Sequence, residues 1–131
     1  MVLIDTSAWI EYLRDTGSYS CLRVAELLAD DVPIATCDTV VMEILAGPTS
    51  EHAANELMRL LDRCRFYPAR PLFDSTGAAA IHRSCRRAGF TPRRLNDCLI
   101  AAIALEHDLS VLHQDRDFER IAEVTGLRVE S

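Results

Sequence analysis

Short apolar runs and longer stretches of helical periodicity alternate along the chain. Runs of three or four apolar residues predict strands, and apolar residues spaced three or four apart predict helices with one buried face. The predicted strands are 2–4, 32–35, 65–67, 109–112 and 127–129. The predicted helices are 7–14, 19–29, 38–46, 51–61, 72–88, 95–107 and 117–123. This alternation predicts a mainly parallel sheet of about four or five strands, covered by helices on both faces in a three-layer α/β/α arrangement.

Polar and glycine residues mark several of the predicted boundaries. Ser7 and Ser50 each precede a helical pattern, so they are predicted N-caps. Gly47-Pro48 is a strong helix stop, and Gly89 predicts the end of the helix that begins near Leu72.

The size of the chain fits a single domain covering residues 1–131. The apolar fraction of 49% is typical of a globular protein, and no apolar run approaches the roughly 20 residues that span a bilayer. The first residues carry no basic leader, so we expect a cytoplasmic protein. The five cysteines form no CxxC pair and are predicted to be buried apolar residues rather than a disulfide or zinc framework.

The net charge of −6 disfavours nucleic acid as a partner when it is considered alone. All 14 basic residues are arginines, however, and their distribution is uneven. A cluster of arginines lies just before Asp97 and could hold phosphates, although a solvated charged face is an equally good interpretation. Its members are Arg83, Arg86, Arg87, Arg93 and Arg94.

Four carboxylates lie at the edges of apolar segments: Asp5, Glu43, Asp97 and Asp115. Asp5 and Asp115 follow predicted strands closely, so a parallel sheet brings them to the same edge. Each acid also has an ordinary interpretation. A strand-end cap would explain Asp5, a solvated helix residue Glu43, and a favourable helix dipole Asp97.

The segment around Asp115 leaves two assignments open. We prefer Asp115 as the functional acid because it is nearer the strand end, and we expect Asp117 to cap the following helix. His113 is a structural residue at the end of a strand, a member of a hydrogen-bond network, or a substrate contact.

Carboxylates gathered at one sheet edge would repel one another and protonate unless a cation compensated them. Oxygen ligands of this kind suit Mg²⁺, with Mn²⁺ as a plausible substitute. The chemistry that such a site favours is hydrolysis of a phosphodiester bond.

Four segments, in this order, resemble the PIN domain family and within it the VapC-type toxin ribonucleases. They are Val2-Leu3-Ile4-Asp5-Thr6-Ser7, Glu43-Ile44-Leu45-Ala46-Gly47, Asp97-Cys98-Leu99-Ile100-Ala101-Ala102-Ile103-Ala104 and Leu112-His113-Gln114-Asp115-Arg116-Asp117-Phe118. His113 departs from the pattern, because relatives usually carry Ser or Thr at that place.

The resemblance implies the toxin of a type II toxin–antitoxin system, a Mg²⁺-dependent endoribonuclease restrained by a VapB-type antitoxin. Asp5 and Asp97 would then be the main metal ligands, with Glu43 and Asp115 completing the acidic pocket and Thr6 as a supporting hydroxyl. The resemblance also implies a homodimer and a higher assembly with the antitoxin. The resemblance also implies that part of the apolar surface on two predicted helices forms a groove for an antitoxin helix, although most of these residues are expected to be core. They are Trp9, Tyr12, Leu13, Leu57, Leu60 and Leu61.

Two other functions remain open from the sequence. A catalytically inactive PIN-fold module would bind RNA or a protein partner without cutting. A phosphatase of the haloacid-dehalogenase type would use Asp5 as nucleophile, but it requires a second acid two residues later, where this chain has Ser7.

Overall fold

A computed structural model describes residues 1–131 and contains one five-stranded sheet in which every pairing is parallel. The strands are β1 (Val2–Ile4), β2 (Ile34–Cys37), β3 (Arg65–Tyr67), β4 (Ser110–Leu112) and β5 (Val129–Glu130). Their order across the sheet is β3-β2-β1-β4-β5, so β1 lies at the centre. The predicted mainly parallel α/β sheet is confirmed.

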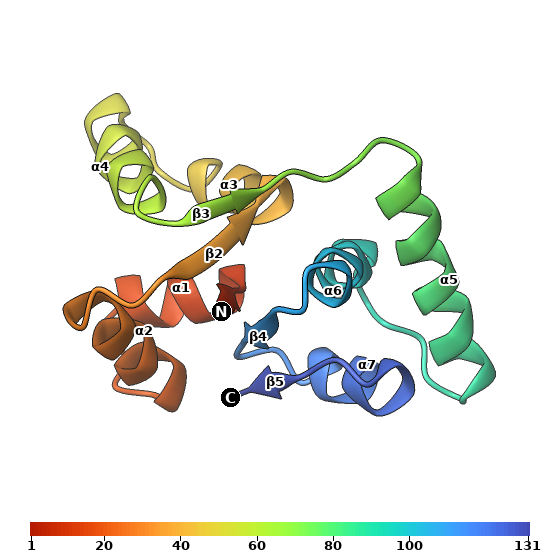
Figure 1. The fold of residues 1–131 in the computed structure, drawn as a ribbon. Coiled ribbons are helices and arrows are strands. Elements are labelled where there is room, and N and C mark those ends of the chain that lie inside the picture. The colour runs from red at the N-terminus through yellow and green to blue at the C-terminus, as the bar shows by residue number, and fades with distance from the viewer.

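Seven helices connect the strands. They are α1 (Thr6–Leu13), α2 (Tyr19–Ala29), α3 (Asp38–Leu45), α4 (Glu51–Leu61), α5 (Phe73–Arg87), α6 (Leu95–Glu106) and α7 (Asp117–Thr125). In Figure 1, α1, α2 and α4 lie on one side of the sheet, and α5, α6 and α7 lie on the other. The three-layer prediction is therefore confirmed. No helix combines the length and the apolar character that a membrane span requires.

The central strands are buried on both faces, as a sheet covered by two helical layers requires. Leu3 and Ile4 of β1 and Val111 and Leu112 of β4 are all 0% exposed. Helix α6 packs Ile100, among other residues, into the same 26-residue core. Four of the five cysteines are buried as predicted, whereas Cys64 is only half-buried, and all five are unpaired.

Several boundaries differ from the predictions, and hydrogen bonds explain the differences near Val32 and Ser7. The second strand starts at Ile34 rather than Val32, because the Val32 N–H is used to close α2 on the Leu27 carbonyl at 3.1 Å. Ser7 does not cap α1. Asp5 is the N-cap instead, and its carboxylate accepts the Ser7 backbone N–H at 3.0 Å. The Ser50 cap of α4 is confirmed.

The parallel order sends the carboxyl ends of all five strands to one edge. Asp5 follows β1 directly, and the loop after β4 carries Asp115. Their backbones are tied together, because the Asp5 N–H donates to the Leu112 carbonyl at 2.9 Å. The central strand pair thus places two of the predicted site residues at adjacent strand ends.

Candidate metal centre

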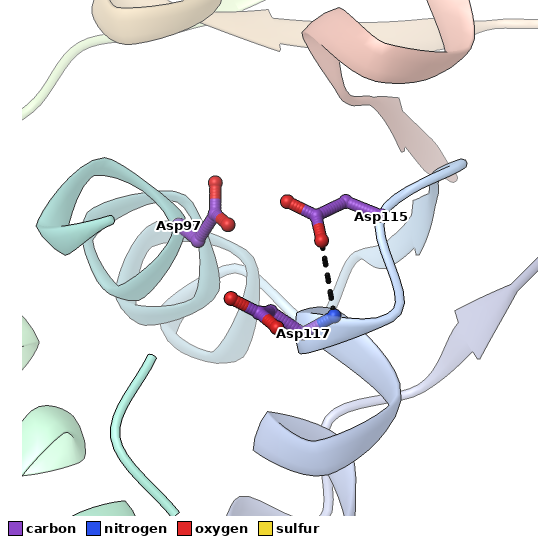
Figure 2. A group of neighbouring side chains, drawn as sticks. All are labelled: Asp97, Asp115 and Asp117. Carbon is purple, nitrogen blue, oxygen red and sulfur yellow. Dashed lines mark hydrogen bonds between the residues drawn. The ribbon is translucent and has the colours of Figure 1, made fainter. Parts of the chain in front are cut away.

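Three carboxylates meet beyond the carboxyl ends of the central strands. One oxygen atom from each of Asp97, Asp115 and Asp117 lies within 4.8 Å of the others, and we call these residues the acid cluster. Figure 2 shows Asp97 projecting from α6, while Asp115 and Asp117 come from the loop and first turn that follow β4. The structure therefore brings Asp97 next to two acids that lie 18 and 20 positions later in the sequence.

Asp97 is held in the first turn of α6 and is 4% exposed. Its Oδ2 atom is buried and has no hydrogen-bond partner in the protein. A buried carboxylate oxygen without a donor is unusual, because leaving it unsatisfied costs free energy. A bound cation would supply the missing partner.

Asp115 and Asp117 are arranged by each other and by Arg93. The Asp117 N–H donates to Asp115 Oδ1 at 3.1 Å, so Asp115 stabilises the start of α7. The prediction that Asp117 caps this helix is wrong. Arg116 is the N-cap residue, and the Asp117 carboxylate accepts from the Arg93 backbone N–H and Nε instead. Asp117 is 4% exposed and belongs to the acid cluster.

The remaining predicted acids, Asp5 and Glu43, lie beside the acid cluster rather than within it. Asp5 is 4% exposed and accepts both the backbone N–H and the hydroxyl of Ser7. Glu43 accepts the Thr6 hydroxyl at 3.0 Å. Thr6 therefore links two of the predicted segments, and its role as a supporting hydroxyl of the site stays a prediction.

The acids titrate differently because their surroundings differ. Burial, followed by the contact with Asp115 and the charge of Asp5, raises the pKa of Asp97 to about 8. Burial also raises the pKa of Asp5 and of Glu43. For Asp115, burial acts upward but the Asp117 N–H, the Asp97 carboxyl and Arg93 outweigh it, so its pKa is lowered. Without a cation, the site therefore pairs a protonated Asp97 with an ionised Asp115.

The residues present fit a hard divalent cation. The donors are carboxylate oxygens, which suit Mg²⁺ and Mn²⁺. Asp97 Oδ2 is a buried oxygen without a hydrogen-bond partner in the protein, and a nearby positive charge would favour the ionised form of Asp97, whose pKa is raised.

His113 supports the loop that carries Asp115. It is 1% exposed, and its Nδ1 accepts the Asp115 backbone N–H at 3.2 Å. Its Nε2 lies 3.2 Å from Glu119 Oε1, although the alignment is too poor for a hydrogen bond. These contacts agree with the structural and network interpretations of His113, and its burial leaves it away from the open cleft.

A polar cleft of about 430 Å³ opens next to the acid cluster. Its lining includes Arg93, Arg94 and Arg116, together with Thr6, Ser7, Ile10, Gln114 and Asp115. Of the predicted arginines, Arg93 and Arg94 line this cleft. Arg86 and Arg87 are exposed in the last turn of α5 and do not line it.

A second depression, of about 250 Å³, lies between α1, α3 and α4. We call it the α1–α4 groove, and its lining includes Leu13, Leu57, Thr6 and Glu43. Trp9, in contrast, is 1% exposed and belongs to the core. The groove and the polar cleft share Thr6, so an occupant of the groove would lie close to the acids.

Comparison with known proteins identifies the family. The model of the PIN domain matches residues 2–124. The chain belongs to the PIN domain family. Its relatives include ribonuclease VapC11 of Mycobacterium tuberculosis, which is 43% identical with 100% of this chain and 98% of the relative covered. Ribonuclease VapC51 of the same species is 33% identical, with 89% of each chain covered.

Solved structures confirm the PIN domain fold of this chain. The VapBC complex of Salmonella typhimurium bound to DNA gives a TM-score of 0.75 at 16% identity, covering 98% of this chain and 96% of the other. VapBC2 of Rickettsia felis, bound to a DNA fragment from its promoter, gives 0.74 at 20% identity, covering 99% and 98%.

Two residues of the site were not singled out from the sequence. The Ser7 hydroxyl donates to Asp5 Oδ2 and accepts the Gln114 N–H at 2.9 Å, so it ties the β1 and β4 loops together. Arg116 lines the polar cleft. A hydroxyl two residues after a strand-end acid was a visible signal, but it was interpreted as a helix cap. Arg116 carried no signal beyond its place between two acids.

Proposed function

We propose that this PIN domain is a metal-dependent endoribonuclease and the toxin of a type II toxin–antitoxin system. The observation that carries the proposal is the convergence of Asp97, Asp115 and Asp117, with a buried Asp97 oxygen left without a partner. The full-length similarity to curated ribonucleases supports the same activity.

The cation would be held at the acid cluster, with Asp5 and Asp97 as its main ligands and Glu43 and Asp115 completing the acidic pocket. Thr6 and Ser7 would keep Glu43 and Asp5 oriented through their hydroxyls. We propose Mg²⁺ as the resident metal, with Mn²⁺ as a substitute, because the donors are all oxygens. When bound, the cation would supply the Lewis acidity that activates water and offsets charge developing on the phosphate.

The chain's own residues would bring the RNA to this metal site. Arg94 and Arg116 line the polar cleft and form no ion pair, whereas Arg93 is paired with two acids. Unpaired guanidinium groups at the mouth of an acidic site hold phosphates that the acids would otherwise repel. Arg86 and Arg87 lie in the last turn of α5 and do not line the cleft, so their binding of RNA stays a prediction.

The α1–α4 groove would receive a helical segment of a VapB-type antitoxin. Its apolar lining, including Leu13, suits one face of an amphipathic helix. Because Glu43 and Thr6 also line the groove, an arginine on that segment would reach the acids and compete with the metal. We also propose that the chain forms a homodimer and a higher assembly with the antitoxin.

The activity is tested by replacing the acid that lacks a partner. We expect Asp97→Asn to lower the rate of RNA cleavage in Mg²⁺ by more than about 100-fold, since even outer partners of metal ligands commonly account for 10- to 100-fold. Asp62→Asn, which changes an exposed acid at the end of α4, is the matched control and should cut normally. Far-UV circular dichroism would verify that both variants are folded.

Chelation distinguishes this enzyme from an inactive RNA-binding module. EDTA should stop cleavage by the native chain, and added Mg²⁺ or Mn²⁺ should restore it. Cleavage that persists in EDTA, or in folded Asp97→Asn, would refute the metal-dependent mechanism. RNA binding without any cleavage would favour the inactive module.

A further inference from the structure

Arg93 contacts two members of the acid cluster at once. Its Nη2 donates to Asp115 Oδ1 at 2.8 Å, and its Nε donates to Asp117 Oδ2 at 3.1 Å. Its backbone N–H also donates to Asp117 Oδ2, at 3.0 Å. The side chain is 64% exposed, so it approaches the carboxylates from the solvent side while they remain largely buried.

These contacts use only one oxygen of each carboxylate. Asp115 Oδ1 receives Arg93 and the Asp117 N–H, and Asp117 Oδ2 receives both Arg93 donors. In Figure 2 the other Asp115 oxygen, which takes no part in the dashed bond, points toward Asp97. Arg93 therefore fixes the two carboxylates from outside and leaves a second oxygen of each available.

Charge balance agrees with Arg93 and a divalent cation being present together. Three ionised carboxylates in the acid cluster carry about −3, and Arg93 supplies +1. A divalent ion brings the sum for the acid cluster to zero, and Asp5 and Glu43 beside it add further negative charge, so a cation can enter without displacing Arg93 from a site where Asp97 and Asp117 are each 4% exposed. Displacement of Arg93 by the metal would instead leave a buried negative charge.

We propose that Arg93 is a positioning residue of the metal site: it holds Asp115 and Asp117 in the orientation that binds the cation, and it stays in place when the cation enters. A planar guanidinium can bond to two carboxylates in fixed geometry, which a single ammonium group cannot do. This inference rests on the proposed metal-dependent function, because it concerns residues of the same site.

The test measures metal binding rather than RNA cleavage. Mn²⁺ would be titrated by isothermal calorimetry into the metal-stripped full chain and its variants. We expect Arg93→Gln to raise the Mn²⁺ Kd by about 10- to 100-fold, the usual effect of losing a partner that orients metal ligands. Arg93→Lys should recover only part of this loss. Arg59→Gln, an exposed arginine on α4 away from the acids, is the matched control and should bind as the native chain does.

Each outcome separates this inference from the function on which it rests. If the native chain binds no Mn²⁺, the metal-dependent function fails and Arg93 has no metal site to organise. If the native chain binds and Arg93→Gln binds equally well or more tightly, only the positioning role fails, because Arg93 is then neutral or a competitor. Full recovery in Arg93→Lys would show that charge alone matters and would also overturn it. Urea unfolding of the metal-free variants would verify that the lower affinity does not arise from lost folding.

Discussion

Asp97 and Asp115 have pKa values shifted in opposite directions because their neighbours differ. Asp115 receives two N–H donors, from Arg93 and from the Asp117 backbone, and these favour its ionised form. Asp97 has an unpartnered buried oxygen and lies near the charges of Asp5 and Asp115, which favours its protonated form. Burial and these neighbouring charges therefore favour a proton on Asp97 when no cation is bound.

The raised pKa of Asp97 makes the stability of the metal-free protein depend on pH. The pKa of Asp97 is about 8 in the folded chain and 3.8 ordinarily, so between these values the folded state holds a proton that the unfolded state releases. The stabilisation is complete below about pH 4 and is lost as the pH rises through 8. We expect the free energy of unfolding in EDTA to fall by roughly 2 kcal/mol or more between pH 5 and 8.

Urea denaturation across this pH range would measure the effect. Asp97→Asn, which carries no titrating proton at this position, should give a flatter profile. Saturating Mn²⁺ should stabilise the native chain most at high pH, because the ionised carboxylates are the form that binds metal. A native profile that stays flat in EDTA would contradict the proton assigned to Asp97.

The sequence predicted the positions of single residues better than their partners. Asp5, Asp97 and Asp115 were predicted site residues, and each lies at the shared edge of the sheet. Asp117 was assigned to a helix cap because its place at the start of a helix favours that role. Its actual partner, Arg93, is 24 positions away, and no local pattern reports a contact of that range.

At the scale of elements, periodicity located every strand and helix, and its errors are confined to their ends. The prediction for α2 matches the structure at both ends, because Ser18 caps it and its apolar spacing is regular. The last strand was placed at 127–129, but the Leu127 N–H bonds to the Thr125 hydroxyl in the turn after α7, and β5 begins at Val129. Hydrogen bonds of this kind decide element boundaries, and the apolar pattern does not encode them.

The α1–α4 groove is an arrangement of elements that the sequence indicated only through the family resemblance. Leu13 lines it and is 44% exposed, so a polar replacement should be tolerated by the fold. We expect Leu13→Glu to weaken the complex with a cognate antitoxin by about tenfold or more, because it places a charge in an apolar contact.

The matched control is Leu22→Glu, which adds the same charge on α2 at a leucine that is 62% exposed and outside the groove. Calorimetry on the two purified toxin variants would compare their affinities for the antitoxin. Equal affinities would place the antitoxin elsewhere on the surface, and the cleavage activity of free Leu13→Glu should be normal in either case.

At the scale of the whole molecule, the net charge of −6 opposes binding to a polyanion, and the distribution of charge resolves the conflict. Several of the 20 acidic residues are gathered at the metal site, where a cation would offset them. Arg94 and Arg116 line the cleft beside that site without an ion pair of their own. RNA binding should therefore depend on a few local contacts and on the metal rather than on a broad basic surface.

A small number of phosphate contacts has a measurable consequence. Each contact to single-stranded RNA contributes about 0.7 to the slope of log K against log salt concentration. We expect Arg94→Gln to reduce that slope by about 0.7 and to weaken binding at low salt. Fluorescence anisotropy of a labelled single-stranded RNA would measure this in an Asp97→Asn background, where the RNA is not cut. Arg59 lies on α4, away from the cleft, so Arg59→Gln should keep the full slope. If Arg94→Gln left the slope unchanged while Arg86→Gln or Arg87→Gln reduced it, the RNA would follow α5, and the polar cleft would not be its path to the acids.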